Sequence, residues 1–344
     1  MPKRRLSKRQ AWRIEKIQQA RNARAQKREA RLDEVTDDQL GPEQMGLVVA
    51  HYGTQVAVER WPCVADSQVQ RCHFRTNLGS LVTGDRVSWR SGNPYGVVVA
   101  VHARLSQLSR PDPYGELKTI AANIDRILIV IAPVPKPHTQ LVDRYLVAAE
   151  NLGITPSLII NKMDLVNATN KALIDDFVRL YNQLGYEVLT VSTRYSSEDF
   201  VSLKTFLASH TSIFVGQSGV GKSSLINQLI PDLNLQVGAL SETRQTGTHT
   251  TTTAQLFHFP DGGQLVDSPG IRELGLWHMR AEDIVYGFPE FRPFIGQCKF
   301  RDCQHRQEPG CAIRQAYKNG QISEYRMASF ESLRSQIEDA GSRN

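Results

Sequence analysis

Short, mainly hydrophobic segments lie between polar turns from residue 44 to residue 108. These segments are rich in β-branched and aromatic residues, and turns that contain Gly, Asn, Asp or Pro separate them. They read GLVVAHYGTQVAVE, HFRTN, DRVSW and GVVVAVHARL. Short strands at a spacing of about 8–12 residues are typical of a small barrel or sandwich. We therefore expect an all-β domain over residues 36–112.

From about residue 120, apolar runs alternate with amphipathic segments. The expected strands are RILIVIAPV, PSLIINK, EVLTVS, SIFVGQS and GQLVDSPG. Helical segments such as VDRYLVAAENLG and IDDFVRLYNQLG lie between them, and each ends in a glycine that can adopt a positive φ. This alternation predicts an α/β domain over residues 113–275, with a parallel sheet and helices on both of its faces.

The C-terminal region has a different composition. After residue 276 the chain is aromatic and rich in proline, then rich in Cys and His, and then helical from Ser323 to Asp339. We assign residues 276–344 to a third domain.

The basic residues are concentrated at the start of the chain. The chain has 41 basic and 35 acidic residues, and 12 of the basic and two of the acidic residues lie between Lys3 and Arg31. This leaves 29 basic and 33 acidic residues elsewhere. The net charge of +6 therefore divides into +10 and −4. Residues 1–35 are predicted to be a disordered extension that binds a polyanion such as RNA. A solubilising tail is the alternative.

The composition excludes several classes of protein. The longest apolar run, Ile127–Ala132, is far shorter than the ~18–20 residues of a membrane-spanning helix. No apolar stretch follows the basic start, as one would in a signal peptide, and five cysteines are too few for a disulfide scaffold. We expect a cytoplasmic protein without a membrane partner.

The length of the all-β region suits a five-stranded barrel of the oligonucleotide-binding (OB-fold) type. Arginines stand near aromatic residues in it, a combination that suits base stacking. They are Arg60, Arg71, Arg75, Arg86 and Arg90, near Trp61, Phe74 and Trp89. Aromatic residues of small barrels also form the core, so both interpretations stay open.

A phosphate-binding loop follows one predicted strand. Residues 216–223 match G-x-x-x-x-G-K-[ST], with the strand SIFV before the loop and the helical segment SSLINQLI after it. The glycines let backbone N–H groups and the helix N-terminus face the phosphates. Lys222 would contact the β- and γ-phosphates, and Ser223 would ligate Mg²⁺. The predicted phosphate-site residues are Gly216, Gln217, Ser218, Gly219, Val220, Gly221, Lys222, Ser223 and Ser224.

Two later segments are predicted to complete the phosphate site. Asp267 ends the strand GQLV and suits a contact to Mg²⁺ and its waters, and Gly270 leaves a backbone N–H for the γ-phosphate. A threonine of the preceding polar stretch GTHTTTT can reach the metal, as switch loops do. Thr250 is our choice, and its neighbour Thr251 is the alternative.

A base-binding motif, Asn161-Lys162-Met163-Asp164, follows another predicted strand. The Asp164 carboxylate can accept hydrogen bonds from N1–H and the 2-amino group of guanine, whereas adenine would leave it unpaired. Ser192 is placed to support that contact. The motif alone also suits a helix start, but beside a phosphate loop it favours guanine.

These elements resemble those of a Ras-like GTPase, but the base-binding motif precedes the phosphate loop. The order is that of a circularly permuted GTPase, which is possible because the termini of compact domains often lie close together.

A cluster of three cysteines and one histidine lies near the C-terminus. Cys298, Cys303, His305 and Cys311 offer a Cys₃His set suited to tetrahedral, structural Zn²⁺. Buried cysteines with a surface histidine are the alternative. We expect Cys63 and Cys72 to be core thiols of the barrel.

The basic tail, the barrel, the permuted GTPase and the Cys₃His knuckle together resemble the ribosome-small-subunit-dependent GTPase A family of bacteria. LKTIAANID, GQSGVGKSSL and GTHTTT are also similar to that family. The resemblance implies a monomeric, cytoplasmic, Mg²⁺-dependent GTP hydrolase with one zinc ion. It further implies binding to the small ribosomal subunit and its rRNA late in maturation, hydrolysis of GTP to GDP on stimulation by the subunit, and release.

The residue after the D-x-x-G motif is Ile271, where Ras-like enzymes place a glutamine that orients water. Intrinsic hydrolysis should therefore be slow. His249 is the best internal candidate for the missing group, and the resemblance implies such a role. A loop histidine that contacts only RNA or solvent is the alternative. Two other functions stay open, a nucleotide-gated RNA-binding module with negligible turnover and a P-loop kinase or ATPase.

Overall fold

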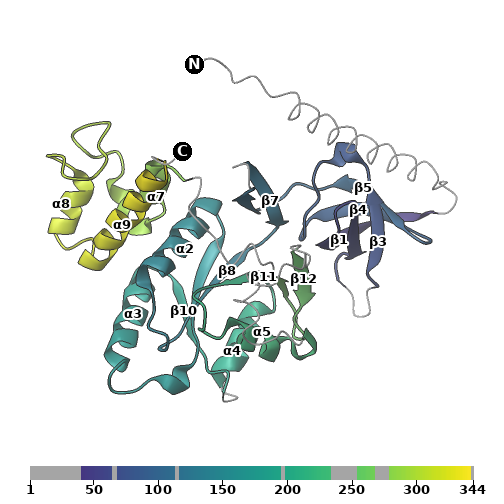
Figure 1. Ribbon diagram of the computed structural model, residues 1–344, viewed down its shortest axis with the longest axis horizontal. Helices are drawn as coiled ribbons and strands as arrows, with labels where there is room; N and C mark the ends of the chain where they lie inside the picture. The colour runs from purple at the N-terminus through teal and green to yellow at the C-terminus, as the bar shows by residue number, and fades with distance from the viewer. Residues whose placement is uncertain are drawn as a thin grey trace, which may run out of the picture. The chain divides into compact units, whose positions relative to one another are not determined.

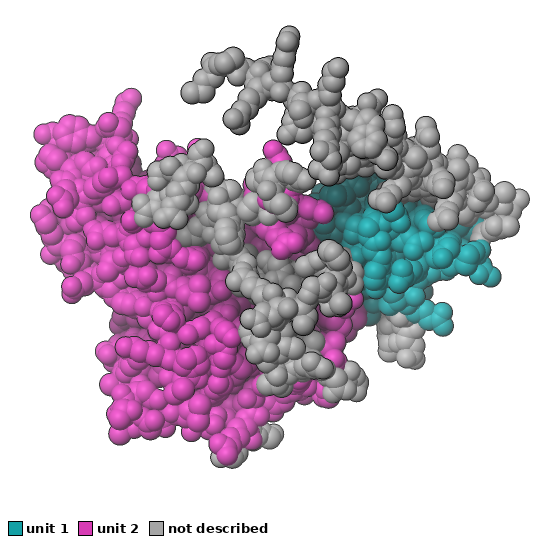
Figure 2. Space-filling view, viewed as in Figure 1, with its two compact units in different colours: residues 1–104 teal, residues 105–344 magenta. Residues whose placement is uncertain are grey.

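The computed structural model describes residues 40–63, 68–112, 116–194, 198–233, 254–267 and 279–341 (Figure 1). The chain divides into two compact units, residues 1–104 and 105–344 (Figure 2). The predicted basic extension lies outside the described residues.

The first unit is a closed five-stranded barrel. Its strands are β1 (Leu40–His51), β2 (Gln55–Arg60), β3 (Gln70–Phe74), β4 (Arg86–Gly92) and β5 (Gly96–Val101), and a short 3₁₀ helix, η2, covers Thr76–Leu78. The strand order is β1-β2-β3-β5-β4, and pairing of β4 with β1 closes the barrel. Only β3 and β5 pair in parallel among these strands. The predicted barrel is confirmed.

Two of the three aromatic residues that the sequence analysis names in the barrel pack in its core. Phe74 and Trp89 are 3% and 4% exposed and pack in the core, so the core interpretation holds for both. Trp61 is partly exposed, and the Arg86 guanidinium lies 5.2 Å from its ring centre. Cys72 is buried, and burial raises the pKa of its thiol to about 12. The prediction for Cys63 is wrong, since this residue lies past the end of β2 and is exposed.

The second unit contains a six-stranded sheet in the order β10-β9-β8-β11-β13-β12. The strands are β8 (Arg126–Ile131), β9 (Thr155–Ile160), β10 (Glu187–Thr190), β11 (Thr211–Val215), β12 (Gln255–His258) and β13 (Gln264–Asp267). The predicted strands are parallel. The sheet is mixed, however, because β12 pairs antiparallel with β13. A separate hairpin joins β6 (Gln107–Pro111) and β7 (Leu117–Ala122).

Helices cover both faces of this sheet, as predicted. They are α2 (Thr139–Leu152), α3 (Lys171–Gln183), α4 (Glu198–Leu207) and α5 (Lys222–Leu229), with the 3₁₀ helices η3 (Met163–Leu165) and η4 (Pro231–Leu233). Leu128 and Val130 of β8 belong to the core under α4 and α5. Ile129 and Ile131 lie against α2 on the opposite face. Alternate residues of one buried strand therefore serve two helical layers.

The C-terminal helices pack around a cluster of three phenylalanines, of which one pair is stacked and two pairs meet edge to face. They are α7 (Ala281–Tyr286), η5 (Pro289–Phe294), α8 (Ala312–Lys318) and α9 (Glu324–Gly341). Phe288, Phe291 and Phe330 are fully buried, with ring centres 4.9–5.8 Å apart. The predicted terminal helix is confirmed as α9. Among the described residues, none of the helices has the length and apolar character to cross a membrane.

Candidate nucleotide site and metal centre

The phosphate-loop motif lies between β11 and α5. Gly216, Gly219 and Gly221 have φ values of 140°, 81° and 91°, which side chains disfavour. A Cβ at Gly216 would lie 2.2 Å from the Val130 carbonyl oxygen, so the loop passes directly over the end of β8. The loop ends where α5 begins, at Lys222, and presents a helix N-terminus to the site.

The Lys222 ammonium lies within this loop. Its Nζ donates to the carbonyl oxygens of Gly216 and Gln217 at 2.7 and 2.8 Å. Ser223 is 8% exposed, on the first turn of α5. A cation and a hydroxyl so placed can serve phosphate oxygens and a bound divalent metal.

The base-binding motif is attached to the phosphate loop by two side chains. Asn161 Nδ2 donates to the Val220 carbonyl oxygen at 3.0 Å, and Lys162 Nζ donates to that of Gly219 at 2.5 Å. Lys162 has a φ of 60°, so it leaves β9 in a left-handed turn. The structure thus brings Asn161 and Lys162 against residues 219–220, which lie nearly 60 positions later.

Asp164 and Ser192 also meet. The Ser192 hydroxyl donates to Asp164 Oδ1 at 2.6 Å, and the Met163 N–H donates to the Val191 carbonyl oxygen at 3.2 Å. These contacts hold η3 beside the end of β10. The second carboxylate oxygen of Asp164 thereby keeps acceptor capacity for a base.

Asp267 ends β13, which runs parallel to β11. The carboxyl ends of parallel strands share one edge of a sheet, so Asp267 lies at the edge that carries the phosphate loop. His249, Thr250, Thr251, Gly270 and Ile271 lie outside the described residues.

The turn after β8 also contributes to the site, although no sequence motif predicted it. Lys162 Nζ also donates to the Val134 carbonyl oxygen at 3.3 Å, in the turn after β8. His138, which directly precedes α2, and Tyr145 of α2 line a small cavity beside Gly216 and Gln217. The position of this turn directly after β8 is the only sequence signal for it, because a backbone carbonyl has no motif.

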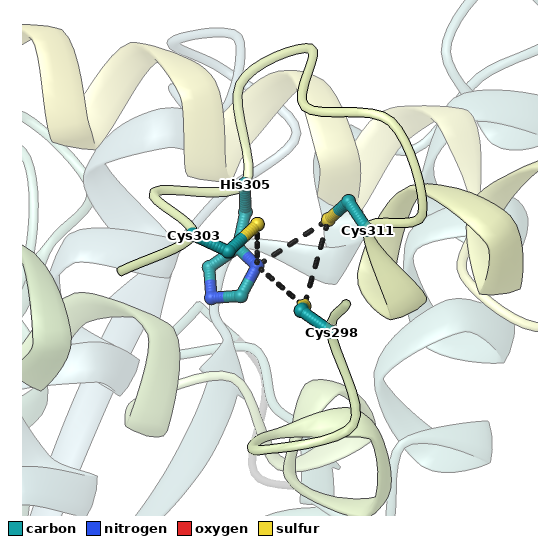
Figure 3. A group of neighbouring side chains, drawn as sticks. All are labelled: Cys298, Cys303, His305 and Cys311. Carbon is teal, nitrogen blue, oxygen red and sulfur yellow. Dashed lines mark hydrogen bonds between the residues drawn. The ribbon is translucent and has the colours of Figure 1, made fainter. Parts of the chain in front are cut away.

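Cys298, Cys303, His305 and Cys311 form one cluster (Figure 3). His305 Nδ1 lies 3.5, 3.7 and 3.4 Å from the sulfurs of Cys298, Cys303 and Cys311. The Cys298 and Cys311 sulfurs are 3.9 Å apart. Ligands at usual Zn–S and Zn–N bond lengths would be about 3.5–3.8 Å apart in a tetrahedron. The donor set and its spacing therefore fit a tetrahedral metal site.

The surroundings of the cluster affect the protonation of its thiols. Desolvation, together with hydrogen bonds to Cys298 and Cys311, raises the pKa of the Cys303 thiol to about 12. The Ala312 N–H donates to Cys298 Sγ at 3.3 Å, and Glu308 accepts the N–H groups of Gln304 and Arg306. A bound metal would stabilise the thiolates that these close contacts otherwise disfavour.

Comparisons with known proteins identify the family of this chain. A family model described as "RsgA GTPase" matches residues 101–277. Proteins named "Small ribosomal subunit biogenesis GTPase RsgA" from Azotobacter vinelandii and Pseudomonas aeruginosa (strain LESB58) are 56% and 55% identical to this chain. Each alignment covers 97% of both partners.

Two solved structures share the fold across most of the chain. YjeQ from Thermotoga maritima matches with a TM-score of 0.71 and 29% identity, over 86% of this chain and 99% of that one. YloQ, described as a circularly permuted GTPase, matches with a TM-score of 0.69 and 28% identity, over 87% and 96%. The chain therefore belongs to the RsgA GTPase family and is a circularly permuted GTPase that hydrolyses GTP.

Proposed function

We propose that this protein is a cytoplasmic GTPase of small-ribosomal-subunit biogenesis. It binds the subunit and its rRNA late in maturation, hydrolyses GTP when the subunit stimulates it, and then leaves. The observation that carries the proposal is the attachment of the N-K-M-D motif to the phosphate loop, through Asn161 and Lys162. Relatives whose names state this function are 53–56% identical over nearly the whole chain.

The site residues divide into binding and chemistry. Asp164, supported by Ser192, holds guanine, and Gly216–Ser224 hold the phosphates. Lys222 and the γ-phosphate N–H contact from Gly270 stabilise charge on the transferred group. Ser223, Thr250 and Asp267 would hold Mg²⁺, directly or through its waters. The metal, when bound, neutralises charge on the phosphates.

His249 takes the place of the glutamine that is absent at Ile271. It orients a water for in-line attack on the γ-phosphorus, which breaks the bond to the GDP oxygen and forms phosphate. The subunit supplies the remaining acceleration, by analogy with activation in trans.

The other parts serve binding and stability. One zinc ion at the Cys₃His cluster would hold the C-terminal loop, and residues 1–35 form an RNA-binding extension. We further propose a monomer whose three folded domains cover residues 36–112, 113–275 and 276–344.

Multiple-turnover phosphate release with purified small subunits tests this function against a nucleotide-gated binding module. Co-sedimentation is measured in parallel with GTP and with a non-hydrolysable analogue. Turnover, with retention on subunits only with the analogue, supports the proposal. Nucleotide-dependent binding without turnover would instead support the binding module.

A further inference from the structure

The metal-binding loop presents an aromatic side chain to solvent. Phe300 is 43% exposed. Three phenylalanines of the same C-terminal region, Phe288, Phe291 and Phe330, are completely buried and form its core. Phe300 is therefore not part of that core, and its ring is available to a partner.

The loop holds Phe300 in a defined position. Cys298 and Cys303, two members of the Cys₃His cluster, lie on either side of it in the chain. The Cys303 N–H donates to the Phe300 carbonyl oxygen at 3.3 Å, and the Lys299 N–H donates to that of Gly310 at 3.0 Å. A loop tied at both ends loses little conformational entropy when it binds a partner.

Two basic residues flank the exposed ring. Lys299 Nζ lies 5.5 Å from the centre of the Phe300 ring, and Arg301 follows it on the surface. The stem of Lys299 lies against Gly310, where an added Cβ would come within 2.8 Å of it. Asp302 is the neighbouring acid, and the Glu308 carboxylate is occupied by two N–H groups of the loop.

A second exposed aromatic residue of this region also lies beside a basic residue, but an acidic residue already neutralises that basic residue. Tyr286 is 52% exposed, with the Arg292 guanidinium 4.6 Å from its ring centre. Arg292, however, forms an ion pair with Glu150 at 2.5 Å and donates to the Tyr286 carbonyl oxygen. Because Arg292 is paired with Glu150, its charge is not available to a ligand beside Tyr286. Lys299 and Arg301, in contrast, provide positive charge beside Phe300.

We propose that Phe300 stacks on an unpaired base of RNA while Lys299 and Arg301 contact the adjoining phosphates. An exposed ring between cations matches the two parts of a single-stranded RNA, a base with a π-face and an anionic backbone. An apolar protein surface would use the ring but not the flanking charges. The proposal rests on the proposed function, since it adds the site of an RNA contact.

The test compares full-length variants that retain their metal. Phe300→Leu keeps an apolar side chain and loses the ring, Phe300→Tyr keeps the ring, and Tyr286→Leu removes the control aromatic residue. Affinity is measured for small subunits, and for a short single-stranded RNA with and without abasic sites. We expect Phe300→Leu to weaken subunit binding by about 5- to 150-fold, and Phe300→Tyr and Tyr286→Leu to bind as the wild type does.

The RNA oligonucleotides separate this inference from the proposed function. The wild type should prefer the strand that carries bases, and Phe300→Leu should lose that preference. The double variant Lys299→Gln/Arg301→Gln should lower the salt dependence by about 0.7 in log–log slope for each phosphate that the variant no longer neutralises. Unchanged binding and base preference in Phe300→Leu would overturn the inference. Failure of the wild type to bind subunits, with the base preference intact, would overturn only the proposed function.

Discussion

Arg326 of α9 and Asp143 of α2 form a completely buried ion pair between the C-terminal helices and a helix that covers the GTPase sheet. Arg326 also donates to Glu290 Oε1 at 2.6 Å, and the Tyr181 hydroxyl donates to Asp143 Oδ1 at 2.7 Å. Asp143 lies on α2, and Tyr145 of this helix lines the cavity beside the phosphate loop. One buried network therefore joins α9, which packs in the metal-binding region, to the helix next to the nucleotide site.

Removing the arginine should destabilise the protein strongly. Arg326→Met leaves the Asp143 carboxylate buried without its guanidinium, at a cost of about 3–5 kcal/mol in the free energy of unfolding. Arg179→Met, which breaks the exposed pair with Asp176, is the control and should change it by less than about 0.5 kcal/mol. Urea denaturation measures both. Equal stabilities of the two variants would show that the buried pair contributes nothing.

The loss of stability in Arg326→Met should depend on pH. Burial raises the pKa of Asp143, and Arg326 opposes that rise. Without Arg326 the folded state therefore binds a proton more readily than the unfolded state, and stability falls as pH rises. As the pH falls from about 7 to about 5, the difference in unfolding free energy between wild type and variant should shrink. A difference that is constant or grows on acidification would contradict this assignment.

Asp164 should determine base specificity. Asp164→Asn replaces an acceptor with an amide that cannot accept both guanine donors, so GTP affinity should fall on the order of 10²-fold or more. The amide N–H can instead donate to the 2-oxo group of xanthine, so binding of xanthosine triphosphate should improve. Titration with fluorescent nucleotides measures both affinities. Asp176→Asn on the exposed face of α3 is the control, and GTP binding unchanged in Asp164→Asn would refute the assignment.

Lys222 should be required for hydrolysis. Lys222→Ala removes the cation from the phosphate loop and should lower the GTPase rate on the order of 10²–10³-fold. Lys171→Ala, an exposed lysine paired with Asp175, should leave the rate unchanged. Phosphate release is the measurement, and a rate near that of the wild type in Lys222→Ala would place the chemistry elsewhere.

The Cys₃His cluster should hold one zinc ion per chain. Cys298→Ser removes one thiolate, so the zinc content after dialysis should fall well below one per chain, and the melting temperature should drop. Cys63→Ser changes an exposed cysteine outside the cluster and should retain the metal. Elemental analysis with thermal unfolding measures both, and full zinc content in Cys298→Ser would exclude the sulfur as a ligand.

The sequence pattern predicts individual helices and strands better than it predicts which of them pair or pack together. Strand β11, its glycine loop and α5 follow one another, so periodicity and the motif are enough to predict them. Strand β12 covers only Gln255–His258, too short to show a period, and its antiparallel pairing depends on the turn before β13.

Contacts distant in sequence were not predictable. Arg326 and Asp143 are 183 positions apart, and each looks like an ordinary surface charge of an amphipathic helix. The same holds for the contact between Lys162 and the Gly219 carbonyl, because it depends on which strands become neighbours in the sheet.

The GTPase rate measured with and without small ribosomal subunits tests the central claim most directly. Purified large subunits and Lys222→Ala are the controls, and the salt concentration is varied. Stimulation by small subunits alone, absent in Lys222→Ala and lost steeply as salt rises, is the predicted result. Equal rates with small subunits, with large subunits and with neither would contradict the account.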